Sequence, residues 1–166
     1  MQDYLMTLLG GLAITLQLTA LSLLLGVLLA AGMTWVLERR IPVATQLVQL
    51  WVLIFTGTPL LIQIFLIYYG PGQFEWLKAG PLWPLLKQPW FCAVLALGFN
   101  TAAYSTRLFK GALDAIPAGE VEACRALGFS AGQTLWMKAR HAARRLVPAY
   151  SNEVILVLKG SSLAST

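Results

Sequence analysis

Long apolar stretches separated by short charged segments dominate the pattern of this chain. No acidic or basic residue lies between Asp3 and Glu38 or between Arg40 and Glu75, and residues 88–106 form a third charge-free stretch. A helix that crosses a bilayer needs about 20 consecutive apolar residues, so each stretch can hold a membrane span. The pattern therefore predicts an all-α, polytopic helical membrane protein, with spans at about residues 9–37, 47–69, 90–109 and 149–166.

Two of the predicted spans carry residues that a purely structural membrane helix avoids. Pro59 follows Thr58 in the second span, and a proline break persists in a membrane only where protein or a water-filled cavity covers the freed backbone groups. Glu153 and Lys159 lie in the fourth span, where ionisable residues mark function unless they pair with a neighbouring helix or extend to the interface. Six residues turn a helix by about 600°, so these two occupy different faces, whereas Asn152 shares a face with Lys159. We expect Glu153 to face a polar pathway.

Composition and charge exclude other classes of protein. Apolar residues make up 58% of the chain and charged residues 11%, whereas ordinary globular chains carry about 25% charged residues. The net charge of +5 does not indicate nucleic-acid binding, because such proteins gather their lysines and arginines on a soluble surface. We expect no metal site, since the single histidine, His141, has no cluster of Cys or His partners.

The distribution of lysine and arginine predicts the orientation in the membrane. Nine of these residues follow the first or third span, whereas the long Pro- and Gly-rich loop 70–89 contains two, Lys78 and Lys87. Cytoplasmic loops carry the excess of positive charge, so we expect the N-terminus on the outer side and the segment after the third span in the cytoplasm. Membrane lipid is the expected contact of the basic residues Arg140, Arg144 and Arg145.

Helix start and stop signals mark the segment 117–146 between the third and fourth spans. Pro117 suits the first turn of a helix, and Gly128 suits the left-handed position that ends one. Ser130 followed by Gln133 predicts a capping box that begins a second helix. The first helix has too small an apolar face to form a core by itself. We therefore predict a short capped helix over 117–128 that docks onto another protein.

Four motifs occur in order along the chain: FTGTPLLIQ at 55–63, EACRALG at 122–128, SNE at 151–153 and KGSSL at 159–163. Together they resemble the motifs of permease subunits from bacterial ABC importers of the polar amino-acid branch. The run FLIYYGPGQF at 65–74 is similar specifically to the arginine permeases of that branch. The resemblance implies the type I importer permease fold, with a cytoplasmic coupling helix at the EAA-like motif.

The resemblance also implies the function and the partners. The chain would be one multi-pass permease subunit of the inner membrane, importing a polar, basic amino acid such as arginine from the periplasm. Histidine, glutamine and cystine are the alternative substrates, and a channel or a membrane-embedded enzyme using Glu153 is the alternative class. A second permease, a dimer of ATPase subunits and a periplasmic binding protein would complete the importer. ATP and Mg would bind the ATPase, because this chain has no phosphate-binding P-loop, and we expect neither a cofactor nor a catalytic residue here.

Two groups of residues follow as candidate sites. The substrate-path candidates are Thr56, Thr58, Gln63, Asn100, Asn152, Glu153 and Lys159. The ATPase-coupling candidates are Glu122, Ala123, Cys124, Ala126 and Gly128. Asn100 and its polar neighbours in the third span can either line a pore or pack against another helix.

The sequence departs from the family pattern in three places. Thr56 stands where most of the family has an arginine. The proline that usually ends the EAA motif is missing, and the basic sequence 137–141 stands there instead. Family members carry a fifth span, so we expect the 166-residue chain to be a truncated form.

Overall fold

The computed structural model describes residues 2–165, with the backbone alone for residues 2–5, 7 and 165. Helices make up the described chain, which contains no strand, so the predicted all-α class is confirmed. The elements are α1 (Gln2–Arg39), α2 (Pro42–Gly57), α3 (Leu60–Tyr69), η1 (Pro71–Gln73), α4 (Glu75–Lys78), α5 (Trp83–Leu86), α6 (Pro89–Asp114), α7 (Ala118–Ala126), α8 (Ala131–Gly160) and η2 (Ser161–Ser165).

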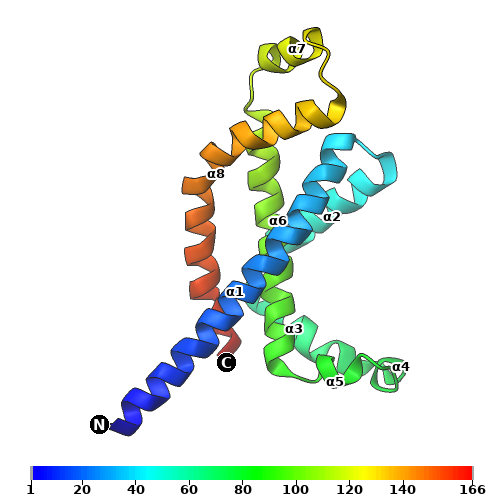
Figure 1. Cartoon of the computed structure of the whole chain (residues 1–166). Helices are drawn as coiled ribbons and strands as arrows, with labels where there is room; N and C mark the ends of the chain where they lie inside the picture. The colour runs from blue at the N-terminus through cyan, green and yellow to red at the C-terminus, as the bar shows by residue number, and fades with distance from the viewer. Residues whose placement is uncertain (1, 166) are drawn as a thin grey trace.

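Helix α6 is the centre of the molecule, because it contacts α1, α2, α3 and α8 (Figure 1). It packs most closely on α1 through two glycines. A Cβ atom added at Gly26 would lie 2.5 Å from Thr101 Cγ2, and one added at Gly98 would lie 2.6 Å from Leu25 Cδ2. Glycine at a helix crossing lets the two backbones approach, which is a common way to pack helices in membranes. The core of the fold therefore lies along the α1–α6 contact.

The predicted break in the second span is present. Helix α2 ends at Gly57 and α3 begins at Leu60, and the chain turns by 109° between them. Thr58 adopts an extended conformation, with φ −114° and ψ 144°, as expected for a residue that precedes proline. The break therefore divides the stretch predicted as 47–69 into two short helices that point in different directions.

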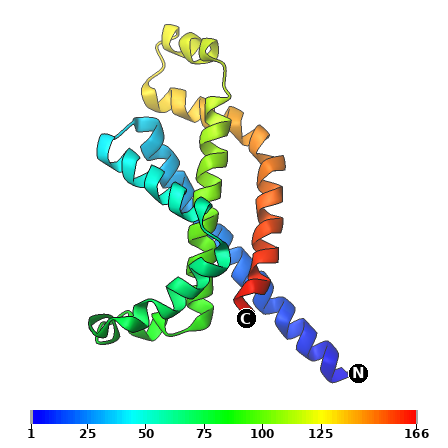
Figure 2. The same cartoon turned by 180° about the vertical axis from the view of Figure 1, so that it is seen from behind.

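The ends of the molecule differ in what they carry. Helix α7 and the turn between α1 and α2 lie at one end, whereas α4, α5, the start of α1 and η2 lie toward the other (Figures 1 and 2). The basic segments 39–40 and 107–146 thus share one end of the molecule. The loop 70–89, which contains η1, α4 and α5, lies at the opposite end.

Helix α8 joins two segments that the sequence suggested were separate. The coupling region was placed at 117–146 and the fourth span at 149–166, whereas α8 runs continuously from Ala131 to Gly160. Pro148 lies inside it, and the helix bends along its length (Figure 1). A proline in a helix interior removes one hydrogen bond and bends the helix without always ending it. The helix stops at Gly160, η2 follows, and Thr166 lies outside the described residues.

Fewer of the observed helices are long and apolar enough to cross a membrane than the charge-free stretches of the sequence predicted. Among the described helices, Leu8–Arg39 of α1 is long and apolar enough to cross a membrane, and α2 with α3 adds a second if the bent pair is one span. Helices α6 and α8 do not meet this standard. Both contain charged residues and a polar, protein-facing side, which lowers their mean hydropathy.

Candidate functional site

A cavity of about 380 Å³ lies between α6, α8 and the start of α3. Its polar lining comes from α6, α8 and η2, and consists of Asn100, Thr101, Tyr104, Glu153, Lys159 and Ser162. Leu97 contributes to its apolar wall. Three of the substrate-path candidates, Asn100, Glu153 and Lys159, are therefore brought together around one cavity.

The helical repeat of α8 directs Glu153 toward this cavity. Glu153, Val157 and Gly160 follow one another at helical spacing and are all buried. A Cβ atom added at Gly160 would lie 3.0 Å from Leu60 Cδ2, so this end of α8 packs closely against α3. Asn152 is exposed and does not line the cavity.

The carboxylate of Glu153 is buried, and Lys159, the cation that lines the same cavity, forms no ion pair with it. The residue is 5% exposed. Among the side chains that the structure describes, none forms an ion pair with it. An unpaired carboxylate in a medium of low polarity is costly, and a cation beside it reduces that cost. The cavity is therefore suited to a positively charged group such as an ammonium or a guanidinium.

Side-chain amides hold the corner between α2 and α3. Gln63 Nε2 donates hydrogen bonds to the carbonyl oxygens of Phe55 at 2.9 Å and of Thr58 at 3.0 Å. It also donates to Thr58 Oγ1 at 2.8 Å, and that hydroxyl donates to the carbonyl of Ile54 at 2.8 Å. Asn100 Nδ2 donates to Gln63 Oε1 at 3.0 Å and to the Phe55 carbonyl at 3.2 Å. These bonds satisfy carbonyls that the break leaves without helical partners.

Thr56 lies away from the Glu153 cavity. Its hydroxyl donates to the carbonyl of Val52 at 2.7 Å, within α2. The residue lines a second cavity of about 390 Å³ whose cations are Arg107 and Lys110. The structure therefore separates Thr56 from Asn100, Glu153 and Lys159, although all four were grouped as substrate-path candidates.

The short helix of the coupling region ends in a defined cap, whereas its N-cap residue, Pro117, makes no side-chain capping bond. Pro117 is the residue before its first turn, and Gly128 has a φ of +77°, in the left-handed region that favours glycine. The amide of Gly128 donates to the carbonyl of Arg125 at 3.0 Å, and that of Phe129 donates to Cys124 at 3.0 Å. This pair of bonds is a Schellman motif, which ends the helix in one defined conformation.

The predicted capping box at the start of α8 is also present. The amide of Ser130 donates to Gln133 Oε1 at 2.8 Å, and the amide of Gln133 donates to Ser130 Oγ at 3.3 Å. Helices α7 and α8 are therefore separated by a short turn whose backbone groups have partners. The orientation of α7 relative to α8 is defined by these local bonds.

Most of the coupling candidates lie on the outside of α7. Cys124 is buried, whereas Glu122, Ala123, Ala126 and Gly128 are exposed. Next to them, Leu127 is 75% exposed. Small side chains flanked by an exposed leucine form a shallow apolar surface that a partner protein can cover.

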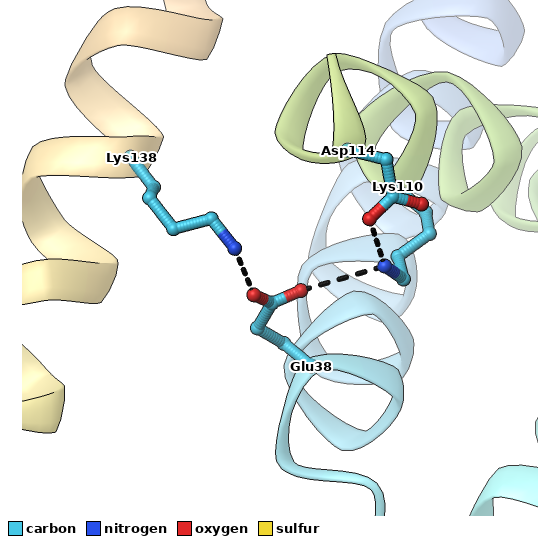
Figure 3. A network of polar contacts seen from close by, with 4 residues as sticks. All are labelled: Glu38, Lys110, Asp114 and Lys138. Carbon is cyan, nitrogen blue, oxygen red and sulfur yellow. Dashed lines mark hydrogen bonds and ion pairs between the residues drawn. The ribbon is translucent and has the colours of Figure 1, made fainter. Parts of the chain in front are cut away.

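An ion-pair cluster at the end of α1 was missed by the sequence interpretation. The carboxylate of Glu38 pairs with Lys138 of α8 and, at 3.6 Å, with Lys110 of α6, which in turn pairs with Asp114 (Figure 3). The sequence offered one signal, because Glu38 is the single acidic residue between Asp3 and Glu75. The motif comparison treated Glu38 merely as the end of a span.

The sequence matches known transport proteins over nearly its whole length. Residues 22–166 match the family described as "Binding-protein-dependent transport system inner membrane component". The chain is 50% identical over 165 residues to the "Arginine ABC transporter permease protein ArtM" of Haemophilus influenzae, covering 99% of this chain and 73% of that protein. It is also 50% identical over 167 residues to ArtM of Escherichia coli strain K12, covering 75% of that protein.

More distant relatives share the same architecture. The chain is 40% identical over 160 residues to the "Octopine transport system permease protein OccM" of Rhizobium radiobacter, covering 65% of that protein. A solved structure, "Crystal structure of an amino acid ABC transporter with histidines", superposes with a TM-score of 0.86 at 29% identity and covers 99% of this chain and 73% of the other. The resemblance to amino-acid ABC importers and the permease fold with its coupling helix are confirmed. This chain therefore belongs to the inner-membrane permease family of binding-protein-dependent transport systems.

Proposed function

We propose that this chain is the permease subunit of an ABC importer that carries arginine, or a closely similar basic amino acid, into the cytoplasm. The observation that carries the proposal is the buried, unpaired carboxylate of Glu153 in the cavity between α6 and α8. The similarity to arginine permeases at 50% identity supports the same substrate. Histidine, glutamine or cystine as substrate has less support, because none of them except protonated histidine brings a cationic side chain to Glu153.

We assign the substrate contact to Glu153, with Asn100 and Lys159 beside it on the cavity wall. The amides of Gln63 and Asn100, with Thr58, hold the corner that borders the path. Thr56 affects the substrate from the neighbouring cavity, without contact, and Asn152 lies exposed on the outer side of α8. In this assignment Glu153 supplies the negative charge, and the broken second span borders the path.

The partners follow from the exposed face of α7 and from the family. The small apolar face around Ala123 and Ala126 docks onto one subunit of an ATPase dimer, which binds ATP and Mg. A second permease completes the path, and a periplasmic binding protein delivers the amino acid. In this assembly the chain translocates substrate and performs no chemical reaction.

In the proposed membrane orientation of the protein, α7 and the α1–α2 turn lie in the cytoplasm. Both lie at one end of the molecule, together with the basic segments that favour the cytoplasmic side (Figures 1 and 2). The loop 70–89 would then face the periplasm with the N-terminus. Binding-protein contact and ATPase contact would occur at opposite ends.

The test is transport by Glu153→Gln in vesicles that contain the assembled importer. The substitution keeps the side-chain shape and removes the charge. Uptake of labelled arginine should fall by about 30-fold or more, because loss of one partner of a buried charge pair costs about 2–5 kcal/mol. Co-purification of the ATPase should not change.

Glu75→Gln is the matched control, because it removes an exposed carboxylate from α4, far from the cavity. It should transport arginine at the wild-type rate. Wild-type arginine kinetics in Glu153→Gln, at normal expression, would show that Glu153 is structural and would remove the main support for a basic substrate.

A further inference from the structure

The coupling helix α7 has few direct connections to the bundle. Among the described helices it contacts mainly α8, and Cys124 is its buried residue. A long contact of 3.5 Å joins Glu120 Oε2 to His141 Nδ1 of α8. A displacement of α7 must therefore reach the membrane helices through the segments that flank it, the end of α6 and the first half of α8.

Glu38 connects both of these segments to α1. Its carboxylate lies between the ammonium groups of Lys138 on α8 and Lys110 on α6, and Asp114 holds Lys110 from the other side (Figure 3). The side chains of Glu38 and Lys138 are 19% and 14% exposed, so solvent screens this pair much less than a surface ion pair. Three helices that are distant in sequence thus meet at one carboxylate.

Packing around Glu38 is incomplete, so the ion pairs form the principal bridge there. A cavity of about 320 Å³ separates the end of α1 from α7 and the first turns of α8, and Val121 and Leu135 line it. A second, apolar cavity of about 250 Å³ lies between α1, α6 and α8, beside Trp35 and Ala142. Both cavities include Glu38 in their lining. With space on either side, α8 is fixed to α1 at this level by Glu38 and Lys138.

We propose that Glu38 is a positioning residue for transport, which transmits the movement of α7 to the membrane helices. Its ion pairs connect the end of α6, which precedes the coupling helix, and the first half of α8, which follows it, to the end of α1. The inference rests on the proposed function as an ATP-driven permease. It predicts that loss of the Glu38 charge separates ATP hydrolysis from substrate transport and leaves the Glu153 cavity unchanged.

The experiment measures ATP hydrolysis and uptake by the full importer in vesicles, with and without substrate-loaded binding protein. In Glu38→Gln, basal hydrolysis should persist, while the stimulation by substrate should fall by about fivefold or more, the usual range of coupling between sites. Uptake per ATP should fall in parallel. The substrate concentration for half-maximal uptake should stay at the wild-type value, because Glu38 does not contact the path.

A second variant keeps the test decisive if Glu38→Gln assembles poorly. Lys138→Gln breaks the same bridge from α8 and should give the same loss of stimulation. The double variant should be no worse than Glu38→Gln alone, because both substitutions remove the same Glu38–Lys138 interaction. Glu75→Gln, which breaks the exposed Glu75–Lys78 pair at the other end of the molecule, is the matched control and should remain coupled.

The outcomes separate the inference from the proposed function. Normal stimulation in both Glu38→Gln and Lys138→Gln, or additive losses in the double variant, would overturn the role of Glu38. A wild-type complex that hydrolyses ATP without any response to substrate would instead contradict the proposed function. A change in the half-maximal substrate concentration alone would also overturn the inference, since it would place Glu38 in substrate binding.

Discussion

Thr56 lies next to two cations, Arg107 and Lys110, which line the same cavity. Most members of the family have a third cation at this position, according to the resemblance of the 55–63 motif. Its absence lowers the positive potential on one side of α2. A cationic substrate that approaches Glu153 from that side therefore meets less repulsion.

Restoring the charge with Thr56→Arg should weaken arginine import more than import of a neutral amino acid. At a separation on the order of 10 Å and an effective dielectric constant of about 20, like charges repel by about 1.7 kcal/mol, or roughly 20-fold in rate. Parallel uptake measurements with labelled arginine and a labelled neutral amino acid check this difference. Thr56→Met adds length without charge and serves as the control. Equal effects of Thr56→Arg on both substrates would show that the position does not sense charge.

Some features of the individual helices are determined by local sequence signals, and others by contacts with distant parts of the chain. The end of α7 and the start of α8 follow from local residues, because Gly128 and the Ser130–Gln133 box each act within a few positions along the chain. Pro148 lies inside α8, where no local pattern shows whether a proline ends a helix or bends it. Arg145 donates to the carbonyl of Ala115 at 3.0 Å, and the second half of α8 packs on α6. These long-range contacts keep both halves of α8 helical around the proline.

Changes in the end of α7 should weaken the association with the ATPase. Gly128→Val forces a β-branched residue into the left-handed region, at a cost of at least about 1–2 kcal/mol. Ala123→Trp places a large side chain on the exposed face and should obstruct docking. Co-purification of the ATPase subunit with the permease measures both effects. Gly119→Ala is the control, since its added Cβ meets open space. Full recovery of the ATPase with both variants would contradict the assignment of α7 as the docking helix.

Over the whole molecule, the sequence predicted the class of elements better than their arrangement. Charge-free stretches located α1 and the core of α6, and the proline located the break after α2. The contact between Glu38 and Lys138 joins positions 100 residues apart, so no local pattern reveals it. Glu153 was identified because a carboxylate in an apolar stretch is unusual by itself. Thr56 and Glu153 line different cavities, which a linear motif could not show because it does not reveal which face of a helix each residue occupies.

The two ends of the molecule should react from opposite sides of the membrane. Single cysteines introduced as Glu75→Cys, in α4, and Gly132→Cys, in the first turn of α8, provide exposed probes of each end. A membrane-impermeant maleimide should label Glu75→Cys in intact cells and Gly132→Cys after permeabilisation alone. The native Cys92 and Cys124 are buried and give the low background. Labelling of Gly132→Cys in intact cells would reverse the proposed orientation.

The hydrogen-bonded corner between α2 and α3 limits how the permease can discriminate between substrates. The amide donors of Gln63 and Asn100 are already occupied by Phe55, by Thr58 and by each other. They cannot bind the carboxylate of an amino acid unless the corner opens, so Lys159 and the hydroxyls of Tyr104 and Thr101 are donors of the cavity wall for that group. Such a wall selects by charge and tolerates variation in shape. Stringent choice among basic amino acids would therefore rest with the binding protein, and the permease would be the permissive component of the importer.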